Sequence, residues 1–338
     1  MIKFFRKIRY NLMSENKTGK YFKYAIGEIV LVVIGILIAL SINNWNESKK
    51  ANINFKKSLE SVFNDLEFDL IRAKDVIVKL DNRRIIADSI INGMYSTPDY
   101  RENLSSLNIL FSYPEFYVTD TGFNTLMQSS EYIPDNYEQL INDLNRQYIN
   151  TKEELAGYRH TSAEFLLATR LFYNRNFTWF SQTDSVSIEK KLHYFVNNPM
   201  YKNDVYGYRL HVLGDYKFAI GKFYSQGLGL YLTIKEVLNN TNQIPSFFPI
   251  NADHYEIDKL DYKGKYSSST GKNFSIEDHN GYLFVNVNGS LLLITPISKD
   301  KFKNYANNSV LTFKRDESNK VIGYDNGSFY FNKVETND

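Results

Sequence analysis

One apolar segment near the N-terminus constrains this chain more than any other feature. Residues 24–42 (YAIGEIVLVVIGILIALSI) are apolar, aromatic or glycine, apart from Glu28 and Ser41. A helix of this length spans about 28 Å, close to the roughly 30 Å hydrocarbon core of a bilayer. In lipid, a single segment satisfies its backbone hydrogen bonds only as a helix. The segment therefore predicts a transmembrane helix over residues 24–42.

The residues before this segment are strongly basic. Residues 1–23 contain seven Lys or Arg side chains and one acid, Glu15, whereas the first basic residue after the segment is Lys49. Positive charge beside a membrane helix stays on the cytoplasmic side. We therefore expect a basic cytoplasmic arm over residues 1–23, an inner-membrane anchor, and export of residues 43–338 to the periplasm.

A cleaved signal peptide is the competing interpretation of the N-terminus. Ala39-Leu40-Ser41 fits the small-x-small pattern of a cleavage site. Against it, the basic region is long, and the apolar run exceeds the roughly 7–15 residues of a signal peptide. A retained anchor is the favoured interpretation.

Four residues are candidate anchor residues: Glu28, Gly35, Ala39 and Trp45. Within lipid, Glu28 either contacts a partner helix, extends to the headgroups or is protonated. Gly35 and Ala39 form a small-xxx-small pair that lets another helix approach closely. Trp45 lies where an interfacial aromatic belt is expected. The expected partners are thus the lipid bilayer and either a second copy of the chain or an envelope protein.

The same region carries a family resemblance. The run ENKTGKYFKYAIGEIVLVVIGILIALSINNWNE, with the preceding MIKFFRKIR, closely resembles the N-terminus of an uncharacterised single-pass membrane protein family of flavobacteria and related Bacteroidota, a domain of unknown function. Further on, TLMQSSEYIP resembles a degraded copy of that family's T-x-x-x-L-x-x-S-G segment, with Ser130 and Glu131 in place of the usual Ser-Gly. The resemblance implies a topology and a taxon, and no activity or site residue.

Residues 43–244 predict a helical bundle domain. Apolar residues recur at helical spacing in long and short stretches, namely 48–92, 104–111, 121–130, 136–180, 187–198 and 206–239. Residues 95–102, around Pro98, are expected to form a loop. Gly221, Gly227 and Gly229 either weaken the last helix or permit close packing. Long helices joined by short loops predict an antiparallel bundle.

Residues 255–335 predict a β domain. Short alternating runs are separated by turn sequences at Asn280-Gly281, Asn288-Gly289 and Asp325-Asn326-Gly327. Their spacing predicts a small antiparallel barrel or sheet of about eight strands. The layout loosely resembles the lipocalin-like β domain appended to some bacterial serine hydrolases, which implies no catalytic residue. The expected fold class is therefore α+β.

The chain shows no recognisable catalytic motif. It contains no Cys, which excludes disulfides and thiolate metal sites, and its five His share no ligand spacing. The H-E-x-x-H, G-x-S-x-G and G-x-G-x-x-G patterns are absent from the sequence. Asp120-Thr121-Gly122 matches the short aspartic-protease core, but an aspartate before a helix is better explained as an N-cap. We expect no enzyme activity and no cofactor.

The densest polar and aromatic cluster in the exported part contains Arg159, Arg170, Arg175 and Trp179. The three guanidinium groups are candidates for contact with an anion or with lipid headgroups. The alternative is a solvated helix face with packed side-chain stems. Nucleic-acid binding is not expected, because the net charge of the whole chain is only +2 and the basic excess lies in the short arm.

These observations predict a non-enzymatic, single-pass inner-membrane protein whose exported part has a scaffolding, envelope-maintenance or sensing role. The alternative is an extracytoplasmic binding protein that holds a lipid or another apolar ligand in its β domain. A hydrolase would need a site that only the fold could assemble. A binding protein requires a lined cavity in the barrel. A scaffold requires a filled barrel and an exposed apolar face on the bundle.

Overall fold

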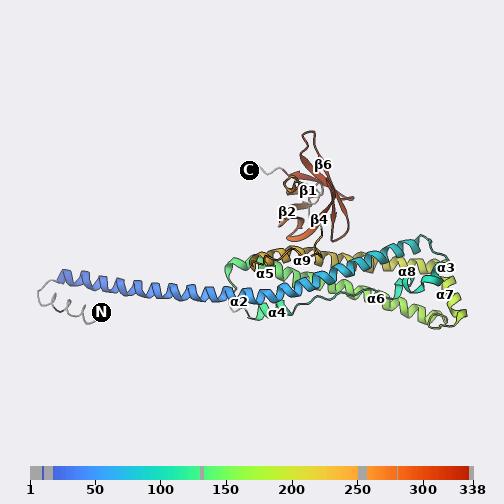
Figure 1. Cartoon of the computed structure of the whole chain (residues 1–338), viewed down its shortest axis with the longest axis horizontal. Helices are drawn as coiled ribbons and strands as arrows, with labels where there is room; N and C mark the ends of the chain where they lie inside the picture. The colour runs from blue at the N-terminus through green and yellow to red at the C-terminus, as the bar shows by residue number, and fades with distance from the viewer. Residues whose placement is uncertain (1–9, 11–17, 130–132, 250–256, 280, 335–338) are drawn as a thin grey trace. The chain divides into compact units, whose positions relative to one another are not determined.

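The computed structural model describes residues 10, 18–129, 133–249, 257–279 and 281–334. Most of the predicted basic arm, the Ser130-Glu131 pair, Asn280 and both ends of the predicted β domain lie outside these residues. The described part has helices first and an antiparallel eight-strand barrel after them, so the α+β fold class is confirmed (Figure 1). The chain divides into two compact units, Met1–Lys57 with Ser130–Asn136, and Ser58–Ser129 with Tyr137–Asp338.

Helix α2 (Thr18–Ile91) contains both the predicted membrane segment and the first predicted bundle helix. Proline is absent from its 74 residues, so nothing in the sequence interrupts the helix where the predicted membrane segment ends. Among the described residues, it is the one helix long and apolar enough to cross a membrane. Its apolar side chains in the first unit are exposed, with half of the Ile34 surface accessible.

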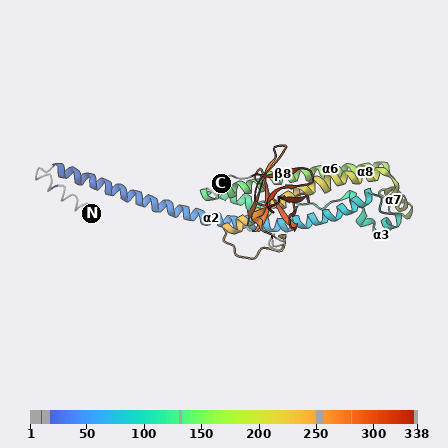
Figure 2. The same cartoon turned by 90° about the horizontal axis from the view of Figure 1, so that it is seen from above.

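The second unit contains the remaining helices of the described chain. They are α3 (Thr97–Leu107), η1 (Ile109–Phe111), α4 (Thr121–Ser129), α5 (Glu138–Asn145), η3 (Arg146–Thr151), α6 (Lys152–Asn176), α7 (Ser185–Asn197), α8 (Pro199–Leu210), η4 (His211–Tyr216), α9 (Lys217–Val237) and η6 (Lys259–Asp261). A further turn, η2 (Asp135–Tyr137), precedes α5. In both views α6 and α8 run lengthwise along the bundle, and α3 and α7 lie together at one end (Figure 2). We call this end the bundle tip.

The predicted loop over residues 95–102 is wrong, because α3 begins at Thr97. The Ser96 N–H donates to the Asp99 carboxylate at 2.7 Å, which starts the helix. Pro98 lies in the first turn, where the backbone needs no N–H donor. Pro98 was expected to prevent a helix here, but it is tolerated because it lies in the first turn of α3.

The predicted start of the last long helix at Tyr206 is also wrong. Helix α8 begins at Pro199, where the Asn198 side chain accepts the Met200 N–H at 2.8 Å. Proline at the first helical position is favourable for the same reason as in α3. The helix then runs through η4 into α9, and both η3 and η4 are π-helical segments between α-helices. Such wider turns place extra residues on a helix without ending it.

The barrel consists of β1 (Gly264–Ser268), β2 (Asn273–His279), β3 (Tyr282–Val287), β4 (Ser290–Ser298), β5 (Lys301–Asn304), β6 (Val310–Arg315), β7 (Val321–Asp325) and β8 (Tyr330–Val334). Each strand pairs antiparallel with the next, and β8 pairs with β1 to close the barrel. Asn288 and Gly289 have φ values of 51° and 83°. A two-residue type I′ hairpin turn requires positive φ at both of its central residues. The turn predicted at this position is confirmed.

Candidate functional sites

The interior of the barrel is filled by its own side chains. Buried aromatic and aliphatic residues from all the strands form one hydrophobic core. At its centre, the Phe313 ring lies 4.8 Å from the Tyr262 ring, 5.4 Å from Phe302 and 5.3 Å from Tyr324, between ring centroids. Burial of the phenol raises the pKa of Tyr324 well above its ordinary range. This packing is the filled barrel that a scaffold requires.

An open cleft of about 410 Å³ lies beside the barrel. It is lined by Lys265, Tyr266, Asn273, Phe274, Ser275, Asn286, Asn288, Gly289 and Val334. Polar and charged residues are numerous in this lining, but Tyr266, Phe274 and Val334 make its surface more apolar than polar. An apolar ligand held in the β domain therefore stays a prediction.

A buried arginine holds one end of the barrel together. Arg315 is 11% exposed and lies 2.8 Å from the Asp261 carboxylate and 2.9 Å from that of Asp300. It also donates to the Tyr262 hydroxyl at 3.0 Å. Burial acts to raise the pKa of Asp300, but the hydrogen bonds from Arg315 and Tyr262 outweigh it and lower that pKa. The network joins η6 to the hairpins and leaves no unpaired charge on these three residues.

Helix α9 packs directly on strand β4, with little between the two backbones. The Leu293 N–H donates to the Ser225 hydroxyl. A Cβ atom on Gly221 would lie only 3.0 Å from the Ala306 carbonyl carbon, and one on Gly229 would lie 3.3 Å from the Leu291 side chain. The close-packing interpretation of the α9 glycines therefore holds at both positions. The bundle and the barrel form a tight, buried junction.

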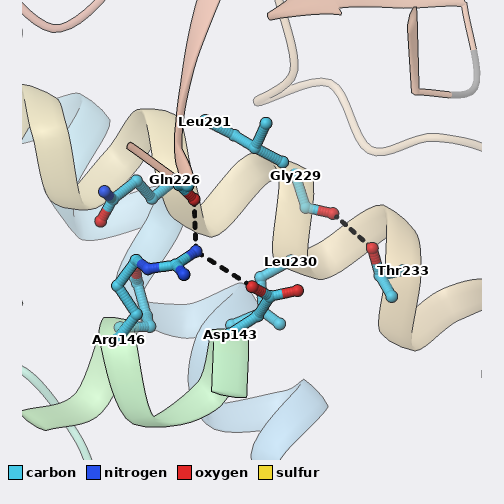
Figure 3. A pocket seen from close by; sticks show the side chains of 9 residues that line it. Asp143, Arg146, Gln226, Gly229, Leu230, Thr233 and Leu291 are labelled. Carbon is cyan, nitrogen blue, oxygen red and sulfur yellow. Dashed lines mark hydrogen bonds and ion pairs between the residues drawn. The ribbon is translucent and has the colours of Figure 1, made fainter. Parts of the chain in front are cut away.

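Arg146 crosses this junction from the first residue of η3. Its guanidinium donates to the Gly289 carbonyl and lies 3.1 Å from the Asp143 carboxylate (Figure 3). A Cβ atom on Gly289 would lie 2.7 Å from Nη2 of Arg146, so the turn glycine also makes room for the arginine. This contact joins residues 143 positions apart, and the sequence gives no signal for it.

A void of about 30 Å³ lies next to Arg146, lined in part by Gln147 and Gln226. The buried Gln147 Oε1 and Gln226 Nε2 atoms have no hydrogen-bond partner among the described residues. A void of this size suits one or two water molecules, whereas small-molecule sites are typically about 300–1,000 Å³. The void is therefore too small for a typical small-molecule ligand.

Two carboxylates on α2 bind the start of α4. Asp69 is fully buried, and its oxygens accept the Thr119 N–H at 2.6 Å and the Thr119 hydroxyl at 2.9 Å. Asp65 accepts the Gly122 N–H at 2.7 Å. Burial raises the pKa of Asp69 to about 6, although the Thr119 hydrogen bonds act to lower it. The Asp120-Thr121-Gly122 sequence thus belongs to a helix start docked on α2. Asp120 precedes α4 as an N-cap residue would, but its carboxylate accepts from the Lys152 ammonium, and Asp65 accepts the Gly122 N–H.

The structure places all four predicted anchor residues in α2. A Cβ atom on Gly35 would meet nothing within 4 Å, and Ala39 is exposed. Trp45 is also exposed, with the Lys49 ammonium 5.4 Å from its ring. Glu28 is half-buried. Their roles as bilayer or helix contacts stay predictions.

The three candidate arginines do not converge on one point. Arg159 donates to the Phe116 carbonyl at 3.2 Å, and its guanidinium lies 4.1 Å over the Tyr117 ring. Arg170 donates to the Phe111 carbonyl at 2.6 Å, about 16 Å further along α6. Arg175 is exposed in the last turn. The first two hold the segment before α4 against α6, and contact with an anion stays a prediction for all three.

The exposed face of α2 in the second unit carries a row of heptad-spaced positions that the sequence analysis missed. Positions 64, 68, 71, 75, 78, 82 and 85, spaced alternately by four and three, are all exposed; four of them are apolar, and Asn64, Asp75 and Asn82 are polar. Phe68, Ile71, Val78 and Ile85 are 55%, 49%, 52% and 66% exposed. We call these four residues the α2 stripe. Their spacing is that of a coiled-coil seam.

Residues 28–148 match the model of a family described as Family of unknown function (DUF6090). The match begins in α2 and ends in η3, and covers 121 of 338 residues. It agrees with the predicted resemblance to an uncharacterised family and assigns no activity. The comparisons found no match to the chain among curated proteins or among solved structures.

Proposed function

We propose that this chain is a single-pass inner-membrane protein whose periplasmic bundle is a non-catalytic scaffold. Residues 24–42 anchor it, residues 1–23 stay in the cytoplasm, and residues 43–338 are exported. The partner of the scaffold is a second copy of the chain, bound through the α2 stripe. The barrel in this proposal is a structural module and carries no ligand.

The α2 stripe is the observation that carries the proposal. Single exposed apolar residues are ordinary on a protein surface, but a row at heptad spacing along one helix face is what a partner helix covers. Ile71, Val78 and Ile85 are β-branched and recur every seven residues. β-Branched residues at one core position of a parallel coiled coil favour two strands.

The membrane anchor favours a second copy over an unrelated partner. Two copies anchored in one bilayer share an orientation, so their α2 helices are parallel, as an in-register seam requires. Confinement to the bilayer also raises the effective concentration of one copy for another. Asn64, Asp75 and Asn82 occupy the other three positions of the seam, so we expect the isolated contact to be weak.

The absence of Cys makes the test direct, because each variant then contains a single thiol. Val78→Cys is expressed in its native membrane, oxidised mildly and run on a non-reducing gel. Equivalent positions on two parallel helices face each other, so we expect a disulfide-linked dimer. Ser328→Cys, on an exposed barrel turn, is the matched control and should stay monomeric. Absence of the Val78→Cys dimer, or equal crosslinking of both variants, contradicts the second-copy proposal.

The control variant tests the orientation of the anchor, because Ser328 is exposed and is not part of the α2 stripe. In intact spheroplasts, a membrane-impermeant maleimide should label Ser328→Cys and should leave Ser14→Cys unlabelled until lysis. The reverse pattern contradicts export of the bundle. Release of the labelled chain from the membrane fraction supports the cleaved signal peptide instead.

A further inference from the structure

The bundle tip contains a cleft that neither the motifs nor the proposed scaffold role explains. It has a volume of about 640 Å³, within the range of small-molecule and oligomer sites. Its lining comes from α7, from the segment after α6 and from the start of α8, namely Trp179, Glu189, Lys190, His193, Tyr194, Asn197, Asn198 and Pro199.

One side of the cleft is aromatic. The rings of Trp179 and Tyr194 lie 5.4 Å apart, between centroids. Phe177 supports both rings, at 4.8 Å from Trp179 and 4.7 Å from Tyr194, and does not itself line the cleft. Behind them, Tyr173 contacts Tyr194 at 5.8 Å, and its hydroxyl donates to Asp204 at 2.8 Å. The aromatic side is therefore braced by a second layer of packed side chains.

The other side of the cleft is polar, and its side chains come from one face of helix α7. Glu189, His193 and Asn197 recur every four residues, so they lie on one face of α7. Arg101 donates to Glu189 at 2.6 Å and holds that carboxylate in place. His193 and Asn197 are exposed at the cleft. Together they supply both donors and acceptors at its rim.

We propose that this cleft binds a saccharide chain. A pyranose ring has a face of C–H groups, which packs on an aromatic ring, and a rim of hydroxyls, which need donors and acceptors. Trp179 and Tyr194 supply the apolar surface, and Glu189, His193 and Asn197 supply the hydrogen bonds. The rim contains one carboxylate, Glu189, beside one ammonium group, Lys190, so the cleft has no single sign of charge to select an anion. Its openness to solvent fits a chain that extends beyond the site.

The chain contains two Trp residues, Trp45 and Trp179, so Trp45→Phe leaves Trp179 as the only indole. The full-length variant in detergent is titrated with cellotetraose, chitotetraose and maltotetraose, with Trp179 emission as the readout. We expect a saturable change with at least one of these oligosaccharides, with a Kd of roughly 1 mM or lower. This measurement does not depend on dimer formation or on topology.

Two substitutions separate a site from a non-specific effect. In the Trp45→Phe background, Asn197→Ala should weaken binding at least about fivefold, because it removes hydrogen bonds without touching the aromatic packing. Met200→Ala, an exposed change on α8 outside the lining, should leave the affinity unchanged. Far-UV circular dichroism confirms folding of both. No saturable response to any of the three probes, or equal affinities for both variants, overturns the proposal.

Discussion

The barrel and the bundle of the second unit both have apolar cores, but they differ in where their charged and amide side chains lie. The barrel core is apolar and aromatic, and its charged network of Arg315 lies at one end. The bundle buries polar side chains among its helices, including Asp69, Gln147, Gln226 and Lys217. Its long helical runs also contain two π segments, η3 and η4.

The difference shows how each part fixes its register. A closed antiparallel ladder pairs the strands through their backbones, so alternation alone directs one face inward. Packed helices have no hydrogen-bond ladder between them. Two arrangements in which one helix is shifted along another can therefore bury similar amounts of apolar surface. We expect the buried polar contacts, such as Asp69 with Thr119, to select one arrangement of the bundle.

The largest effect should come from the barrel core. Phe313→Ala removes a ring that contacts Tyr262, Phe302 and Tyr324. We expect a loss of about 3–5 kcal/mol in the free energy of unfolding, measured by urea denaturation of the full-length protein. Val310→Ala, on the exposed face of the same strand, should cost less than about 1 kcal/mol. Similar losses for both would show that the interior is not packed as described.

The next effect tests a buried polar group of the bundle. The pKa of Asp69 is raised by burial to about 6 in the folded chain, so ionisation of Asp69 opposes folding. The contribution of protonated Asp69 to stability is complete below the ordinary aspartate pKa near 3.8. It is lost as the pH rises through the folded-state pKa of about 6. Asp69→Asn does not ionise. Between about pH 4 and 7, its stability relative to the natural chain should therefore improve by on the order of 3 kcal/mol.

Unfolding free energies at several pH values provide this measurement. Asp75→Asn, an exposed carboxylate on the same helix, is the matched control. A stability difference between Asp69→Asn and the natural chain that does not change with pH would contradict the burial of a shifted carboxylate.

The smallest effect compares one substitution at two helical glycines. Gly221→Ala should destabilise by about 1–3 kcal/mol, because the added Cβ meets the Ala306 backbone at the junction. At Gly157 in α6, a Cβ meets nothing within 4 Å, so Gly157→Ala should stabilise by up to about 1 kcal/mol. Thermal or urea unfolding measures both, and effects of equal sign would mean that α9 does not approach the barrel closely.

The sequence predicts the barrel better than the bundle for a physical reason. Strand alternation and turns such as Asn288-Gly289 are local signals, and the structure confirms both. The buried face of α2 also follows from its spacing. The hydrogen bond from Arg146 to Gly289 and the docking of Asp69 on Thr119 join residues far apart in sequence, and no local pattern specifies them. The exposed α2 stripe has no separate signal in the sequence, because the buried residues of α2 already account for its helical periodicity.

The candidate arginines show the same limit. Arg159 and Arg170 have the composition of an anion site, yet both donate to backbone carbonyls of the segment before α4. An arginine with free donors and one that holds a loop look identical in sequence. The tip cleft also depends on the fold, since Trp179 comes from a loop and Tyr194 from a helix.

The pairing of β8 with β1, which closes the barrel, affects how the protein behaves at high local concentration. An open sheet leaves a row of unpaired N–H and C=O groups, on which a neighbouring chain can add a strand and begin to aggregate. Proteins held in one bilayer meet their own copies often. Because Lys265 pairs with Val334 and the ladder continues to Ser268 and Phe331, the described barrel offers no free edge to such a neighbour. In the second-copy proposal, contacts between copies therefore use side chains, whose sequence determines which partner is accepted.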